Sequence, residues 1–153
     1  MEKIIMINGK ETRIKVSAAT NILYKRVFKE DILLQLSAYS KNLMELKEIQ
    51  AKMNRIQADT TKTKEEIASE MTDLVSSDVF DEINSFSSDV LPKLAYIMYL
   101  EANETEITIF RKLNEECYLI WLLGIDQNEL LNITKEVMEL WQTGAVNTSK
   151  QKN

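Results

Sequence analysis

Three groups of neighbouring carboxylates are the side chains whose spacing could support chemistry. They are Glu65–Glu66, Glu115–Glu116 and the pair formed by Asp126 and Glu129. Paired carboxylates act as general acid and base when their environments separate their pKa values, and they can also hold a divalent cation. The sequence indicates no cleft around these pairs, and solvated helix faces and helix caps explain all three. We therefore expect no catalytic residue and no metal site.

The composition argues against most other catalytic designs. The chain has 153 residues with no histidine, one cysteine and three scattered glycines. It therefore lacks an imidazole base or metal ligand and a glycine loop that could cradle a phosphate. Cys117 lies on an apolar stripe without a basic residue within one helical turn, which is typical of a small buried hydrophobe. We expect a protein that is not an enzyme and that binds no cofactor.

Charge and hydropathy indicate no nucleic-acid partner and no membrane. The formal net charge is -5, and the small basic cluster Lys25, Arg26 and Lys29 adjoins Glu30 and Asp31, so we interpret it as a solvated helix face. No run approaches the roughly 18 apolar residues that span a bilayer, and the N-terminal "IIMI" is too short for a signal peptide. The most apolar stretch, "CYLIWLLGI", has the length of a buried helix segment. An unpaired cysteine is compatible with the reducing cytoplasm.

The elements that would position any site are predicted to be mainly α-helical. Residues 1–16 form the exception, because Asn8-Gly9 favours a type I′ turn and therefore a two-residue hairpin. The turn sets the register and places Ile7 opposite Lys10. One face of the hairpin then carries residues suited to packing on helices: Ile5, Ile7, Thr12, Ile14 and Val16.

The second face of the hairpin exposes Ile4 and Met6 beside Arg13. A two-stranded ribbon is marginal by itself in water, so the hairpin must rest on the helical body or pair with another chain. We expect its free edges to serve self-association through Ile4, Met6 and Arg13.

The remainder predicts a bundle of six or seven helices within a single domain, 1–142. Residues 17–57 form a short helix and a long amphipathic helix, 58–66 a polar loop, and 67–142 the helical body. Asp126 and Glu129 form a capping box that begins the last helix, and Gly144 ends it. Residues 143–153 are expected to be a disordered tail.

The long helix carries an apolar stripe with steps of three and four residues. Two interpretations are open: a helical hairpin with the 65–75 segment, or a surface for a helix of a second copy or a partner. Trp121 is expected to anchor the core, whereas Trp141 near the loose tail could contact a partner. The candidate partner-binding residues are Leu36, Tyr39, Leu43, Leu46, Met53 and Trp141.

The order of these segments carries a family resemblance. An "INGKETRIKVSAAT" hairpin precedes "LYKRVF" and "EDIL", then "LAYIMYLEAN" in the middle, "YLIWL", and "EVMELWQTG" before a short Lys/Asn/Ser tail. This order resembles the tail assembly chaperones of long-tailed phages and prophages of Gram-positive bacteria.

The resemblance implies a holdase for one client, the tape measure protein, in the host bacterial cytoplasm. Several copies would coat the client, leave as tube subunits polymerise, and be absent from the mature virion. A longer product made by ribosomal frameshifting would recruit the tail tube protein. Gln151-Lys152-Asn153 can be encoded with the slippery pattern A AAA AAY, which predicts a −1 shift at or just before this point. The alternative is a structural coiled-coil or adaptor subunit that stays in the phage assembly.

Overall fold

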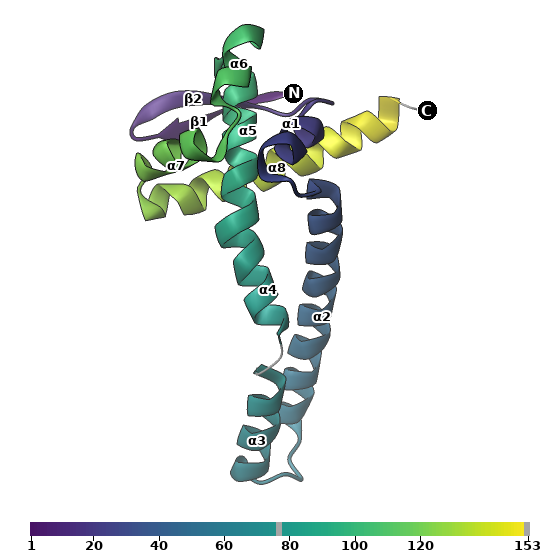
Figure 1. Cartoon of the computed structure of the whole chain (residues 1–153). Coiled ribbons are helices and arrows are strands. Elements are labelled where there is room, and N and C mark those ends of the chain that lie inside the picture. The colour runs from purple at the N-terminus through teal and green to yellow at the C-terminus, as the bar shows by residue number, and fades with distance from the viewer. Residues whose placement is uncertain (76–77, 152–153) are drawn as a thin grey trace. The chain divides into compact units, whose positions relative to one another are not determined.

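The computed structural model describes residues 1–75 and 78–151, with 145–151 described by their backbone alone. Its elements are β1 (Glu2–Ile7), β2 (Lys10–Lys15), α1 (Thr20–Phe28), α2 (Ile32–Ala58), α3 (Lys64–Val75), α4 (Val79–Ser85), the π-helical turn η1 (Phe86–Val90), α5 (Leu91–Asn103), α6 (Glu106–Lys112), α7 (Glu115–Leu123) and α8 (Gln127–Gln151). The predicted fold class, an N-terminal hairpin followed by helices, is confirmed (Figure 1).

The chain divides into two compact units. The first comprises Met1–Leu33 and Ser87–Asn153, and the second comprises Leu34–Phe86. The first boundary therefore falls near the start of α2 and the second falls within η1. The hairpin, α1 and α5 to α8 belong to the first unit, which we call the hairpin unit. The second, which we call the arm unit, holds most of α2 together with α3 and α4.

The hairpin has the predicted turn and register. Asn8 and Gly9 both have positive φ, 52° and 73°, as a type I′ turn requires. The two strands are antiparallel and place Ile7 opposite Lys10 and Ile5 opposite Thr12. The Asn8-Gly9 dipeptide therefore determines which side chains share a face.

The inner face of the hairpin rests on helices of the same unit. Ile5, Ile7 and Ile14 are buried, and β2 lies against α5 whereas β1 lies against α8 (Figure 1). Burying three large aliphatic side chains contributes roughly 1.5–3 kcal/mol each relative to exposure. This contact stabilises a ribbon that would be marginal alone.

Helix α5 is the centre of the hairpin unit. Its buried side chains cover most of its circumference rather than a single stripe: Leu91, Pro92, Leu94, Ala95, Tyr96, Ile97, Met98 and Leu100. A helix that is apolar on nearly every side is stable where neighbours surround it. Contacts with β2, α1, α6, α7 and α8 provide that surrounding.

Helix α8 does not end at Gly144 as the sequence predicts. It continues to Gln151, so nine residues of the predicted tail region, 143–151, are helical, and residues 152 and 153 lie outside the described part of the chain. Glycine costs a helix interior only about 1 kcal/mol relative to alanine. Packing explains why residue 144 is a glycine, because a side chain at Gly144 would meet Val16.

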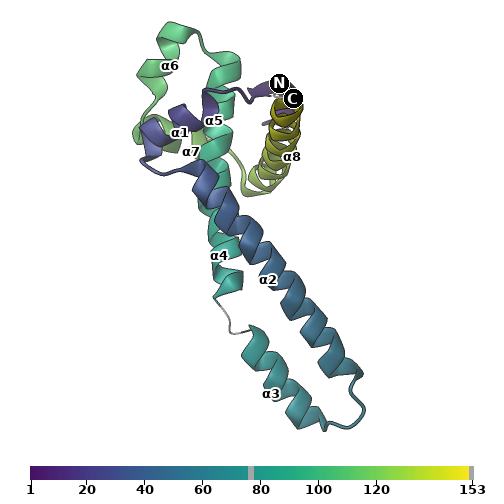
Figure 2. The same ribbon diagram turned by 90° about the vertical axis from the view of Figure 1, so that its right-hand side faces the viewer.

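The arm unit is an antiparallel pair of helices with a short turn. Helix α2 is 27 residues long, which agrees with the predicted long helix, and α3 runs back alongside its C-terminal part (Figure 2). Within the predicted polar loop, Asp59 Oδ1 accepts hydrogen bonds from the backbone N–H and the hydroxyl of Thr61, at 2.9 Å and 2.6 Å. These bonds lower the pKa of Asp59 and order the turn.

Candidate functional site

The acidic pairs identified in the sequence lie at helix starts. Glu65 and Glu66 are exposed in the first turn of α3, and Glu115 and Glu116 are exposed in the first turn of α7. A carboxylate at this position interacts favourably with the helix dipole. No cluster of cysteine and carboxylate side chains suited to a metal ion occurs within the described parts of the chain.

The third pair serves to attach the hairpin turn. Asp126 Oδ1 accepts from the N–H of Asn128 at 3.3 Å, which fits a helix cap. Glu129 does not complete the predicted capping box, since its Oε1 accepts from the N–H of Asn8 at 2.9 Å. Asn8 Nδ2 also donates to the carbonyl of Gly124 at 2.6 Å. The capping-box prediction is wrong: Glu129 Oε1 turns to the hairpin in a charge-assisted bond, and Oε2 has no hydrogen-bond partner among the described residues.

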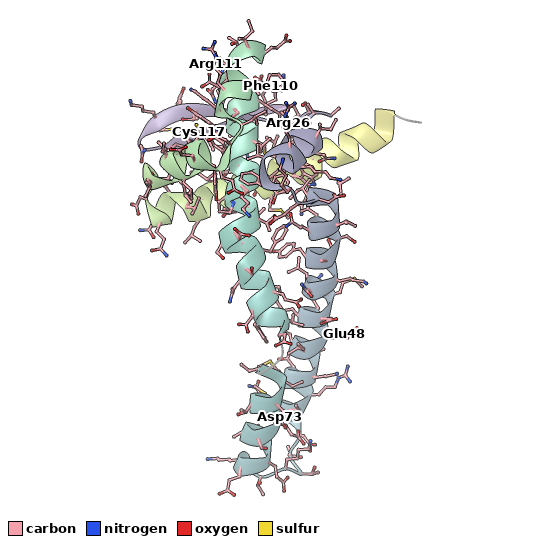
Figure 3. The ribbon with its side chains drawn as sticks, in the orientation of Figure 1. Arg26, Glu48, Asp73, Phe110, Arg111 and Cys117 are labelled. Carbon is pink, nitrogen blue, oxygen red and sulfur yellow. The ribbon has the colours of Figure 1, made fainter. Side chains whose placement is uncertain are left out.

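Cys117 is a structural residue of α7. Its thiol is half-buried, and its backbone N–H donates to Asn114 Oδ1 at 2.8 Å, which caps the helix. The sequence predicts a small buried hydrophobe at this position, whereas the structure leaves Cys117 partly exposed. Figure 3 labels Cys117 among the side chains of the hairpin unit.

The apolar stripe of α2 is half-buried along its length. Its candidate partner-binding residues, Leu36, Tyr39, Leu43, Leu46 and Met53, all have intermediate exposure. Tyr39 stacks on Phe86 with ring centroids 4.2 Å apart and an interplanar angle of 12°. This stack lies within the arm unit and joins Tyr39 to Phe86, which is outside the 65–75 segment of the predicted helical hairpin, so the choice between the two interpretations of the stripe stays open. Leu34 and Met44 on the same helix are exposed.

The two tryptophans differ in their surroundings. Trp121 packs against Tyr96 and Tyr99, with centroid distances of 5.4 Å and 5.7 Å, but it is half-buried rather than a buried core anchor. Trp141 is half-buried on α8. Part of its ring therefore remains accessible to a partner, although it is not among the strongly exposed apolar residues of the described chain.

The three hairpin residues predicted for self-association lie on one face of the ribbon. Ile4 and Met6 are 58% and 56% exposed, and Arg13 is also exposed. Ile4 stands opposite Arg13 across the strand pair. The structure therefore brings these residues together and leaves them accessible.

The most unusual surface belongs to α7. Leu119, Ile120 and Leu123 are 54%, 64% and 86% exposed, and Tyr118 is its single buried residue. A helix that is apolar all round is normally buried. We call Leu119, Ile120 and Leu123 the α7 patch, and we regard it as the candidate functional site.

A second apolar surface lies where α1 meets α6. Ile22, Ile107 and Phe110 are exposed, and the guanidinium carbon of Arg26 lies 5.0 Å from the centroid of the Phe110 ring. Figure 3 shows Arg26 and Phe110 side by side. A cation–π contact at such an exposed site contributes about 0.5–1 kcal/mol. The contact with Arg26 fixes the Phe110 ring and covers part of its apolar surface.

Sequence reasoning missed the α7 patch because it assigned "CYLIWLLGI" to a buried helix on length and hydropathy. One feature of the sequence could have revealed the patch: the segment from Cys117 to Leu123 has no polar face. A helix of nine residues at the edge of a small body cannot be covered on all sides. Some of these side chains therefore had to be exposed unless another chain covered them.

Comparisons with protein families, with characterised proteins and with solved structures find no match to this chain. In the described residues, no helix has both the length and the hydropathy to cross a bilayer.

Proposed function

We propose that this chain is a tail assembly chaperone of a long-tailed phage or prophage. In this proposal it binds the tape measure protein and keeps it soluble until tail tube subunits polymerise around it. Two observations support the proposal: the sequence resemblance and the exposed α7 patch. The α7 patch is the observation that carries it, since exposed apolar side chains on a folded protein are typical of a binding surface.

The chemistry of the α7 patch suits an apolar helix as client. A client helix can place side chains spaced three and four residues apart against a neighbouring helix. Glu115 and Glu116 at the start of α7 and Asp126 after its end are exposed. These carboxylates favour a client helix whose apolar face is flanked by lysine or arginine. They also oppose aggregation of the chaperone itself through its negative charge.

The proposal includes several copies bound along one client and a homo-oligomer in solution. It also includes the longer frameshifted product, which would contact the tail tube protein, and a place of action in the host cytoplasm. The retained adaptor subunit is the competing function. Mass spectrometry of mature particles separates the two, because a chaperone is absent from the particle whereas an adaptor is present.

The direct test is co-expression with the tape measure protein encoded in the same genome. We expect the wild-type chain to move the client from the pellet to the soluble fraction. The triple variant Leu119→Ser, Ile120→Ser, Leu123→Ser should fold, as judged by circular dichroism, and should lose this effect.

A matched control changes exposed apolar residues of the arm unit and leaves α7 intact. The variant Leu34→Ser, Met44→Ser, Val75→Ser removes three side chains of comparable exposure and should retain full client solubility. If both triple variants work as well as wild type, the α7 patch is not the client surface. If the wild-type chain fails to solubilise the client, the chaperone proposal is wrong.

A further inference from the structure

The outer edge of β1 has main-chain groups that are turned away from β2. In an antiparallel pair, residues alternate between hydrogen-bonded and non-hydrogen-bonded positions. Met1 and Val16 exchange two bonds, at 3.1 Å and 2.9 Å, which identifies the odd-numbered residues of β1 as the bonded set. The N–H and C=O groups of Ile4 and Met6 therefore point outward, and they form no hydrogen bond with any described residue.

The outer edge of β2 differs because a residue of α5 bonds to it. Asn103 Nδ2 donates to the carbonyl of Arg13 at 2.8 Å, and β2 packs against α5. Arg13 is the residue opposite Ile4, so a carbonyl at the equivalent position of the other edge already has a partner. The β1 edge is therefore the more open of the two to a new strand.

A groove runs beside the open edge. A cavity of about 350 Å3 is lined by residues 3–6 of β1 and by Asn132, Ile133 and Glu136 of α8. Lys3 forms ion pairs with Glu136 and, at 3.1 Å, with Glu139, and these pairs hold β1 and α8 together. The groove therefore lies between β1 and α8.

We propose that the β1 edge docks one extended segment of a partner protein. Such a segment would satisfy the outward N–H and C=O groups of Ile4 and Met6, in the mode called β-strand addition. Its side chains would alternate between the two faces of the enlarged sheet. Apolar residues suit the face shared with Ile4 and Met6, and polar residues suit the face toward Asn132 and Glu136.

A second copy of the hairpin fits this edge less well than a single strand. The sequence predicts pairing between copies here, but β1 carries α8 beneath it, as the ion pairs of Lys3 show. Strands in a sheet lie about 4.8 Å apart, whereas packed helices need 8–10 Å between their axes. Two hairpins joined at β1 would bring two copies of α8 into one space. A lone strand has no such helix.

The inference is tested on the full chain with a tethered probe strand. The probe alternates valine and threonine (VTVTVT) and precedes Met1 through a linker of about six Gly and Ser residues, which spans roughly 14 Å on average. Tethering raises its effective concentration to the millimolar range. We expect amide exchange at Ile4 and Met6 to slow about tenfold relative to the untethered chain. Unchanged exchange at both residues would overturn the inference.

Proline variants show which edge of the hairpin pairs with the probe strand. Ile4→Pro removes an outward N–H that β2 does not use, so the hairpin should persist while protection of Met6 is lost. Glu11→Pro makes the same change on the other strand, and it should leave protection at Ile4 and Met6 intact. The double variant Ile4→Lys, Met6→Lys keeps both amides and tests the apolar face without proline. Equal protection in all variants would contradict strand docking at β1.

Sedimentation of the untethered chain separates this inference from pairing between copies. If the wild type is an oligomer that Ile4→Pro converts to monomer, a second hairpin is the occupant and the inference is wrong. An association state that Ile4→Pro leaves unchanged supports it. The result does not depend on the chaperone function, because no client protein is present.

Discussion

Gly144 of α8 lies directly against Val16, the residue that follows β2. A Cβ atom built on Gly144 would be 2.7 Å from Cγ1 of Val16, which is far inside ordinary contact distance. Val16 is also tied to Met1 by backbone hydrogen bonds, so it cannot move without disturbing the hairpin. The lack of a side chain at Gly144 therefore allows α8 to pass this close to the end of β2.

We expect Gly144→Ala to destabilise the hairpin unit. The β-branched side chain of Val16 has restricted χ1 rotamers and cannot easily turn away. Overpacking costs about 1–3 kcal/mol, which exceeds the roughly 1 kcal/mol that alanine gains over glycine in a helix interior. The free energy of unfolding in urea should fall by about 1 kcal/mol.

The double variant Val16→Ala, Gly144→Ala should restore part of that loss, because the clashing methyl groups are gone. Gly124→Ala is a matched control, since its Cβ would meet a single carbonyl at an ordinary 3.5 Å, and its stability should stay within about 0.5 kcal/mol of wild type. A Gly144→Ala variant more stable than wild type would refute the packing argument.

Glu101 gives the stability of the hairpin unit a pH dependence. The carboxylate accepts hydrogen bonds from Ser17 Oγ at 2.5 Å and Thr20 Oγ1 at 2.6 Å. Burial nevertheless raises the pKa of Glu101 above its ordinary 4.5, because it outweighs the opposing effect of these hydroxyls. The folded state therefore binds this proton more tightly than the unfolded state does.

The contribution of Glu101 to stability is largest below pH 4.5 and is lost as the pH rises through the higher pKa of the folded state. We expect the free energy of unfolding of wild type, relative to Glu101→Gln, to fall between pH about 4 and about 7. Urea titrations of both proteins across this range measure the difference. A difference that is constant or grows with pH would show that the folded-state pKa is not raised.

The hairpin and the long helix were predictable because local rules determine them. Asn8-Gly9 requires positive φ at two successive residues, and the structure has both. The register then follows by counting residues. Steps of three and four residues along α2 likewise predict its length and its apolar side without knowledge of any neighbour.

The end of α8 and the role of Glu129 were not predictable in this way. Gly144 has the sequence pattern of a helix stop, and only the position of Val16, which is distant in the sequence, explains why a glycine stands inside α8. Asp126 and Glu129 have the pattern of a capping box, but Asn8 competes for the carboxylate. Both depend on tertiary contacts between distant segments, which a local pattern cannot contain. The exposure of α7 also depends on what surrounds it.

Tyr118 and Leu123 give a matched test of the α7 patch within one helix. Tyr118 is buried. Its ring centroid lies 5.2 Å from that of Phe28, in an edge-on arrangement, and 5.6 Å from that of Tyr96. Tyr118→Ala should cost about 3–5 kcal/mol of unfolding free energy. Leu123→Ala should change it by less than about 0.5 kcal/mol. A large loss in Leu123→Ala would mean that α7 is covered in solution.

Tyr39 distinguishes a structural role of the α2 stripe from a client-binding role. Its stack on Phe86 holds α2 to the end of the arm unit. We expect Tyr39→Ala to lose about 1–3 kcal/mol, because it removes both apolar burial and an aromatic pair. Faster amide exchange in α2 and α4 should accompany the loss.

Met44→Ala is the control for this prediction, because Met44 is on the same helix and exposed; its exchange rates should match wild type. Client solubility in the co-expression assay should survive Tyr39→Ala wherever the protein remains folded. If Tyr39→Ala instead keeps wild-type stability and abolishes client solubility, the stripe contacts the client. The α7 patch would then not be the sole client surface, since an intramolecular stack and a client contact cannot both occupy the same face of the ring.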